Sequence, residues 1–171
     1  LSIQVHPNDD LAKERHNSFG KTEMWYVIQA EDSGNLIVGF NKDSSKEEYV
    51  DHLESKRLLK ILNQETVEKG DVYFIPTGRI HAIGAGVLLA EIQQTSDITY
   101  RVYDWDRLDD AGNSRELHTE LAVDAIDYSS EKQYSTDYNT AENVSTPVVS
   151  CDYFTTNIVV VNGEVQIDNS A

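Results

Sequence analysis

The sequence predicts a mainly β fold with a small helical insertion and the start of a second β unit near its end. Short segments rich in β-branched and aromatic residues recur along the chain, and turn-forming residues separate them. Residues 45–62 instead have the apolar spacing of one or two amphipathic helices, introduced by a capping box from Ser45 to Glu48. A chain of 171 residues, 39% of them hydrophobic, fits one globular domain or a domain with a fragment of another.

The first segment, residues 1–6, alternates apolar and polar side chains and is predicted to be a strand. Its Ser2, Gln4 and His6 therefore lie on one face. Further strands are expected over 24–28, 36–40, 72–75, 87–92, 99–103, 150–161 and 164–167, and short helical segments over 11–18 and 115–125. Asn162-Gly163 has the composition of a hairpin turn between the last two strands.

These elements predict three regions. Residues 1–126 form the core with its helical insertion at about 45–62, residues 127–147 form a linker or long loop, and residues 148–171 begin a C-terminal β unit that is truncated. The chain also opens directly on a strand, without Met, so we expect it to be part of a longer protein.

The composition restricts the classes of partner. Asp and Glu number 30 against 14 Lys and Arg, which gives a net charge of −16 and disfavours binding to nucleic acid or to anionic membrane surfaces. An anionic substrate would need a local cationic pocket. There is no apolar run of about 18 residues, the length of a membrane span. The single Cys151 rules out an internal disulfide and suits a reducing compartment, so a cytoplasmic location is predicted.

One stretch, from Gly70 to His81, carries the clearest functional pattern. It combines a turn, a buried strand over 72–75, a sharp bend at Pro76 and Gly78, and then a histidine. A histidine fixed after a rigid turn is suited to binding metal, although a hairpin followed by an incidental histidine has the same sequence. The spacing of Gly70, Pro76, Gly78 and His81 resembles the second signature of the cupins, which implies a jelly-roll β-barrel and a metal ligand at His81.

The cupin resemblance implies that the other ligands come from an earlier signature, for which the candidates are Gln4, His6 and Glu23. Two imidazoles, a carboxylate and an amide oxygen suit Zn²⁺ or another divalent first-row ion. Alternatively, Gln4 and His6 are ordinary polar strand residues and Glu23 is a surface carboxylate. The intact motif ending at His81 favours the metal site.

A closer resemblance covers residues 1–107. The blocks 2–7, 20–26, 75–84 and 91–107 together resemble type I mannose-6-phosphate isomerases in their short bacterial form, residues 115–118 extend the match, and residues 127–171 match loosely. The resemblance implies one Zn²⁺ per chain and a reversible conversion of mannose 6-phosphate to fructose 6-phosphate through an enediol. It assigns His6, Glu23, His81 and Gln4 to the metal, Arg101 to catalysis, and Ser2, Lys21 and Glu91 to the substrate pocket.

Other interpretations stay open at this point. A non-catalytic cupin that binds a sugar or sugar phosphate would share the barrel, and an Fe(II) oxygenase would share two His and one carboxylate. The proton carrier could be Glu91, a metal-bound water or a residue outside this chain, and the oligomeric state is undetermined. His16 is expected to be exposed, His118 to cap or pack a helix, and Trp25 and Trp105 to line the core or pocket wall.

Overall fold

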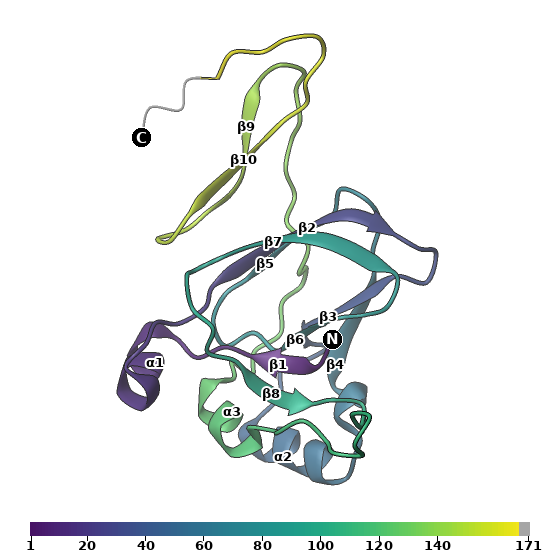
Figure 1. Cartoon of the computed structure of the whole chain (residues 1–171), viewed down its shortest axis with the longest axis vertical. Coiled ribbons are helices and arrows are strands. Elements are labelled where there is room, and N and C mark those ends of the chain that lie inside the picture. The colour runs from purple at the N-terminus through teal and green to yellow at the C-terminus, as the bar shows by residue number, and fades with distance from the viewer. Residues whose placement is uncertain (168–171) are drawn as a thin grey trace.

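The computed structural model describes residues 1–167 and shows two antiparallel sheets facing each other, with helices beneath one sheet and a hairpin above the other (Figure 1). The strands are β1 Ile3–Val5, β2 Glu23–Ala30, β3 Asn35–Phe40, β4 Leu62–Thr66, β5 Val72–Ile75, β6 His81–Ile83, β7 Val87–Gln93, β8 Tyr100–Tyr103, β9 Ser145–Ser150 and β10 Thr155–Val159. The helices are α1 Asp9–His16, α2 Lys46–Glu54, the 3₁₀ turn η1 Leu58–Lys60 and α3 Thr119–Ala125.

The larger sheet has the order β4-β3-β6-β1-β8 and the smaller one β5-β2-β7. Between them lies an apolar cluster drawn from both sheets, which includes Trp25, Val27, Leu36, Val38 and Tyr73. The predicted mainly β fold of the cupin type is therefore confirmed. Within residues 1–167, no helix is long and apolar enough to cross a membrane.

The outer face of the larger sheet is covered by α2, η1 and α3. Ile3 and Val5 of β1 and Tyr100 and Val102 of β8 are buried there in one cluster with residues of the helices, such as Ala122. Because side chains alternate along a strand, Gln4 of β1, His81 of β6 and Arg101 of β8 point toward the smaller sheet. The predicted helical insertion forms α2 and η1 of this layer, and Ser45 caps α2 as expected because its hydroxyl accepts a hydrogen bond from the Glu48 N–H.

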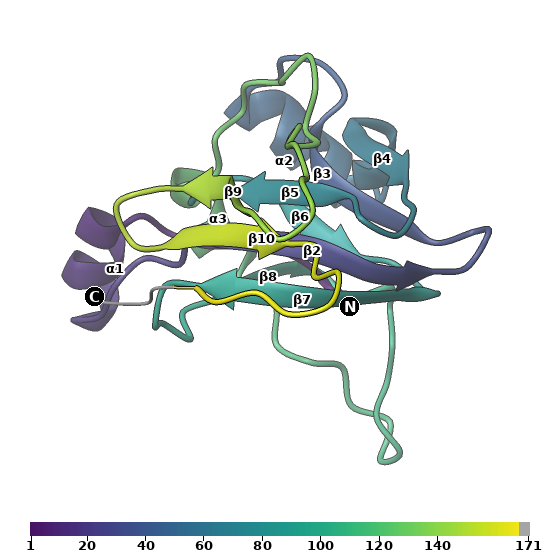
Figure 2. The same ribbon diagram turned by 90° about the horizontal axis from the view of Figure 1, so that it is seen from above.

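The hairpin β9–β10 lies across the outer face of the smaller sheet (Figure 2), where Val149 packs with Met24 and Val72. The hairpin was predicted at the wrong position in the sequence. The turn occupies residues 151–154 rather than Asn162-Gly163, residues 164–167 form no strand, and residues 168–171 lie outside the described part of the chain. The reason is tertiary: Val148, Val149 and Phe154 pack against the sheet only when the chain reverses between them.

The segment 127–147, predicted as a linker, runs along the barrel and contacts it. Tyr134 is buried beside Gly39, and its hydroxyl donates a hydrogen bond to the Phe40 carbonyl over 2.8 Å. The Thr136 N–H donates to the Val72 carbonyl over 2.7 Å. The division of the chain into a core, a linker and a C-terminal unit remains a prediction.

Candidate functional site

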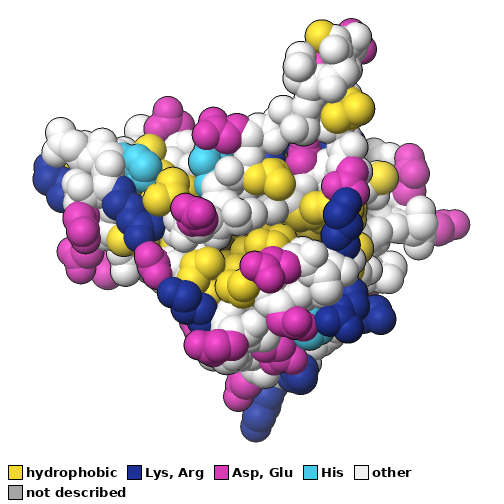
Figure 3. Space-filling view, turned by 90° about the horizontal axis from the view of Figure 1, so that it is seen from below, with side chains coloured by type: hydrophobic (Ala, Val, Ile, Leu, Met, Phe, Trp, Pro, Cys, Tyr) yellow, Lys and Arg dark blue, Asp and Glu magenta, His cyan; other side chains and the backbone are white. Residues whose placement is uncertain are grey.

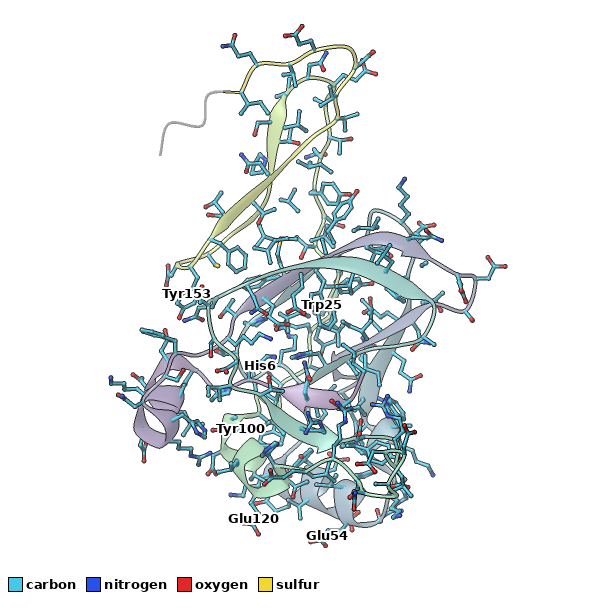
Figure 4. The ribbon with its side chains drawn as sticks, viewed as in Figure 1. His6, Trp25, Glu54, Tyr100, Glu120 and Tyr153 are labelled. Carbon is cyan, nitrogen blue, oxygen red and sulfur yellow. The ribbon has the colours of Figure 1, made fainter. Side chains whose placement is uncertain are left out.

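Three predicted ligands, His6, Glu23 and His81, meet between the two sheets. His6 follows β1, while Glu23 and His81 are the first residues of β2 and β6. Their ligand atoms all lie within 4.8 Å of one another, and each side chain is at most 1% exposed. Figure 4 shows His6 and Trp25 in the space between the sheets. The group could hold a metal ion.

The turn after β5 fixes two of these residues at once. Gly78 has a φ of +86°, a conformation that glycine adopts more readily than other residues. Its N–H donates a hydrogen bond to the His6 carbonyl over 2.9 Å, and its carbonyl accepts one from Asp127 over 2.9 Å. The same bend that precedes His81 therefore also holds the backbone of His6.

Each imidazole is oriented by a backbone carbonyl. His6 Nδ1 donates to the Ile98 carbonyl and His81 Nδ1 donates to the Arg79 carbonyl, both over 2.8 Å. With the proton on Nδ1, a neutral ring presents the lone pair of Nε2. Histidines that bind metal are held in this way in many proteins, because the second nitrogen fixes the tautomer and the ring orientation.

The lone pairs of the group face one another. His6 Nε2 lies 3.2 Å from Glu23 Oε1, and His81 Nε2 lies 3.8 Å from Glu23 Oε2. Within residues 1–167, neither His6 Nε2 nor either oxygen of Glu23 has a hydrogen-bond partner, although all three atoms are buried. Buried acceptors are costly unless paired. Ligands of a tetrahedral ion lie roughly 3.4 Å apart when each bond is about 2.1 Å long, so the spacing suits a bound cation.

The ionisation of the group is compatible with metal binding. Burial by itself raises the pKa of Glu23, but its contacts with His6, His81 and Lys21 outweigh this effect and lower the pKa to about 2. Burial lowers the pKa of His81 to about 4, against the opposing charge of Glu23. At neutral pH the group therefore contains an ionised carboxylate and a neutral His81.

Two further predicted residues lie beside the group. The Gln4 amide is 3.3 Å from His81 Nε2, because β1 and β6 pair in a register that places these residues opposite each other. The Lys21 ammonium forms an ion pair with Glu23, 2.8 Å from its Oε1, and lies 3.6 Å from Glu91 Oε1. In the structure, Lys21 is therefore paired with two carboxylates.

Trp25 contacts both Glu91 and His81, which its apolar surroundings in the sequence did not predict. Its indole N–H donates to Glu91 Oε2 over 3.1 Å, and its ring meets His81 edge-on at 5.3 Å. Trp25 lies opposite Glu91 in the pairing of β2 with β7, so both side chains point into the barrel. The unusual carboxylate in the apolar β7 segment is thus paired.

Arg101 lies on the same face of the larger sheet as Gln4, directly opposite it in the register of β1 with β8. Its Nη1 donates to the Glu116 carbonyl over 2.8 Å, and its Nε is buried with no hydrogen-bond partner among residues 1–167. Ser2, just before β1, is 3% exposed. The structure thus places Arg101 on the strand next to the one that carries Gln4, and Ser2 just before that strand.

The remaining histidines and Trp105 lie away from the group. His16 is exposed and hydrogen-bonds the Tyr100 hydroxyl, and His118 precedes α3 as predicted. Trp105 is 37% exposed rather than buried, with its N–H donating to the Leu1 carbonyl. The carbonyls of Ile98 and Arg79, which orient the imidazoles, have no recognisable signal in the sequence because every residue has a carbonyl.

Two sizeable cavities on the described part of the chain do not include the buried group. One of about 430 Å³ is lined by residues such as Ile37, Ala82 and Trp105, and the other, of about 320 Å³, lies between Leu53, Val102 and their neighbours. Both adjoin η1 through Leu59. Figure 3 shows the molecule from below, with apolar side chains gathered at the centre of this face. Cavity size therefore does not locate the candidate metal site; its buried, unpartnered donor atoms do.

Comparison with known proteins gives one consistent result. A probable mannose-6-phosphate isomerase of Bacillus subtilis is 46% identical over 127 residues, which are 74% of this chain and 40% of that protein. A mannose-6-phosphate isomerase of Streptococcus mutans is 37% identical over 172 residues, which cover 100% of this chain and 54% of that protein. The chain thus spans about half the length of the curated relatives it matches. No protein-family model matches the chain.

Solved structures agree with the sequence relatives. The crystal structure of mannose 6-phosphate isomerase from Bacillus subtilis matches with a TM-score of 0.81 and 38% identity, over 90% of this chain and 50% of that one. A phosphomannose isomerase of Salmonella typhimurium shares the fold with a TM-score of 0.67 at 15% identity, over 91% of this chain and 58% of the other.

Proposed function

Because this chain is related over most of its length to mannose-6-phosphate isomerases, we propose that the protein containing it interconverts mannose 6-phosphate and fructose 6-phosphate. One observation carries the proposal: His6, Glu23 and His81 form a buried group in which His6 Nε2 and both Glu23 oxygens lack hydrogen-bond partners within residues 1–167. Two imidazoles and a carboxylate that converge in this way suit a metal ion, although Lys21 already pairs with Glu23, and the relatives indicate the reaction class. We keep the cytoplasmic location as a prediction that rests on the single Cys151.

The metal is proposed to be one Zn²⁺ per chain, held by His6, Glu23 and His81. Gln4 is proposed as the fourth ligand because its side-chain amide lies beside the group; its nitrogen is 3.3 Å from His81 Nε2, so its oxygen would have to turn toward the ion. When bound, such an ion would polarise the carbonyl or neighbouring hydroxyl oxygen of the sugar. Two histidines and a carboxylate also suit Fe(II), and the relatives favour the isomerase over an oxygenase.

The chain's own residues have distinct parts in the proposed reaction. A proton leaves C2 of the open-chain aldose, an enediol forms, and a proton returns to C1. Arg101 is permanently cationic and stabilises the negative charge that develops on the sugar oxygens. Its buried Nε, which has no partner within the described residues, is a donor available for this purpose. Lys21, with Ser2, is proposed to attract the substrate phosphate despite the net charge of −16.

Three proton carriers are proposed as candidates: Glu91, a metal-bound water and a residue outside this chain. Glu91 is held in place by Trp25 at 3.1 Å and Lys21 at 3.6 Å, so its position is well defined. A general base must lie within hydrogen-bond reach of the proton that it removes. Glu91→Gln tests the first of these candidates. We expect it to abolish interconversion if the Glu91 carboxylate carries the proton, and to leave interconversion in place if another group does.

The test is Arg101→Ala in the protein that carries this chain, measured by metal content and by isomerase turnover. We expect metal content to be unchanged and turnover to fall by at least ~10², the scale for one lost stabilising donor. Arg57→Ala is the matched control, because Arg57 is about half exposed and pairs with Asp51 on the surface. Near-normal turnover of Arg101→Ala contradicts the assigned role. Sugar-phosphate binding without interconversion by the unmodified protein indicates a non-catalytic cupin.

A further inference from the structure

Arg101 lies on a strand that has a neighbour on one side only. In the larger sheet, β8 is the last strand and pairs with β1 alone among residues 1–167. The backbone groups of Arg101 that point away from β1 are both bound by one residue. The Arg101 N–H donates to His118 Nδ1 over 3.1 Å, and the Arg101 carbonyl accepts from the His118 N–H over 2.7 Å.

The residues just before α3 hold the Arg101 side chain as well, since the Glu116 carbonyl accepts from its Nη1 over 2.8 Å. His118 is itself anchored by α3: its carbonyl accepts from Ala122 over 2.9 Å, and Ala122 is buried in one cluster with Tyr100 and Val102 of β8. The segment 116–118 therefore occupies the place of a neighbouring strand. It binds Arg101 through three groups, the backbone N–H, the backbone carbonyl and Nη1.

We propose that His118 is a positioning residue that sets the direction of the Arg101 guanidinium. The inference rests on the proposed function, in which Arg101 stabilises charge on the substrate. The contact requires His118 Nδ1 to accept a hydrogen bond, so the neutral ring carries its proton on Nε2. His118 Nε2 lies 4.0 Å from Glu116 Oε2 at a position that is 25% exposed, so this N–H faces a carboxylate at the surface.

The need for a hydrogen-bond acceptor at His118 Nδ1 predicts different outcomes for two substitutions of this residue. The side-chain oxygen of Asn occupies nearly the place of Nδ1 and can accept the same hydrogen bond, whereas Leu fills similar space and cannot. His118→Leu is expected to lower kcat by about 10- to 100-fold, the scale of a small misplacement of a reacting group, with KM changed by less than about threefold. His118→Asn is expected to remain within about threefold of the unmodified protein. His52→Leu is the matched control, because His52 lies in α2 and contacts the Glu48 carbonyl of its own helix.

A double-mutant cycle tests whether His118 acts through Arg101. In an Arg101→Ala background, His118→Leu is expected to cause no further loss of kcat. An equal loss in both backgrounds overturns the proposal, as does a His118→Asn variant that is impaired as strongly as His118→Leu. These outcomes differ from failure of the proposed function, which appears as near-normal turnover of Arg101→Ala alone and removes the inference with it.

A second measurement does not depend on activity. The Arg101 amide is expected to exchange its hydrogen slowly in this chain and at least about tenfold faster in His118→Leu, because the acceptor that protects it is gone. His118→Asn is expected to restore slow exchange. Exchange at the same rate in all three proteins would show that His118 does not hold this amide in solution, and would overturn the proposal even if the isomerase assignment stands.

Discussion

The substitution Glu23→Gln tests the candidate metal group most directly. It keeps the size of a fully buried side chain and removes the only carboxylate in the group of His6, Glu23 and His81. The amide offers one weakly donating oxygen in place of two charged ones. We therefore expect the affinity for Zn²⁺ to fall while the fold is retained.

The expected size of the effect follows from the number of ligands. Four-ligand zinc sites bind with about 10–16 kcal/mol, so one ligand accounts for roughly 2.5–4 kcal/mol. At about 1.4 kcal/mol per tenfold change, this corresponds to a loss of roughly 10²- to 10³-fold in affinity. The loss should lie toward the upper end, because Glu23 supplies the only negative charge among the three residues.

The assay is a competition titration of Zn²⁺ between the protein and a chromogenic chelator. The matched control is Glu91→Gln, since Glu91 also contacts Lys21 and points into the barrel, yet belongs to no ligand group within the described residues. Its affinity should stay within about tenfold, the lower range for a residue outside the ligand set. A Glu23→Gln protein that binds Zn²⁺ within about threefold of the original would refute the role of this carboxylate as a metal ligand.

Three other substitutions have defined outcomes. Gly78→Ala places a Cβ 3.0 Å from the Ala125 carbonyl at a φ of +86°, so it should cost more than the backbone strain of about 1–2 kcal/mol and should weaken Zn²⁺ binding. Gly112→Ala, at a φ of +84° with nothing within 4 Å, should cost only that strain. Urea unfolding and metal titration check both substitutions. Asp104→Asn should lower stability at pH 7. The pKa of Asp104 is lowered mainly by its hydrogen bonds with Arg115, and also by Arg107, so this stabilisation is present above the unfolded pKa of about 3.9 and lost as the pH falls through the lower folded value. Thermal melts at several pH values should therefore show the difference between the two proteins closing in acid. Trp25→Phe should cost roughly 2 kcal/mol through the cavity it leaves, and a loss below about 0.5 kcal/mol would contradict the close packing of this fully buried side chain.

Local sequence patterns identified the elements in which hydrophobic periodicity and turn chemistry agree. The strand over 72–75 was predicted with its observed bounds, since Gly70 and Pro76 delimit it on both sides. The hairpin of β9 and β10 was misplaced because Asn162-Gly163 is a strong local turn signal, whereas its true turn depends on Phe154 and Val149 reaching the distant side chains of β2 and β5. Packing against segments far away in the sequence is not encoded in a local pattern.

The candidate site, too, could be predicted only in part from local sequence patterns. Spacing placed Gln4 and His6 on one face, and the turn at Pro76 and Gly78 indicated His81, whereas the convergence of these residues was implied by the resemblance to the cupins. The hydrogen bonds from the imidazoles to the Ile98 and Arg79 carbonyls could not be predicted, because the backbone has no residue-specific signature. Nor could the pairing of Lys21 with two carboxylates be foreseen, since it depends on how β2 and β7 align.

The strand β1 has a different neighbour on each of its sides, and this makes the number of residues in it critical. Adding or removing one residue between Ser2 and His6 would turn Ile3 and Val5 toward the polar interior and point Gln4 and His6 at the helices. The exposed loop over 107–113 carries no such alternation. Natural variants of this protein should therefore differ freely in length at that loop, while the count of residues in β1 stays constant.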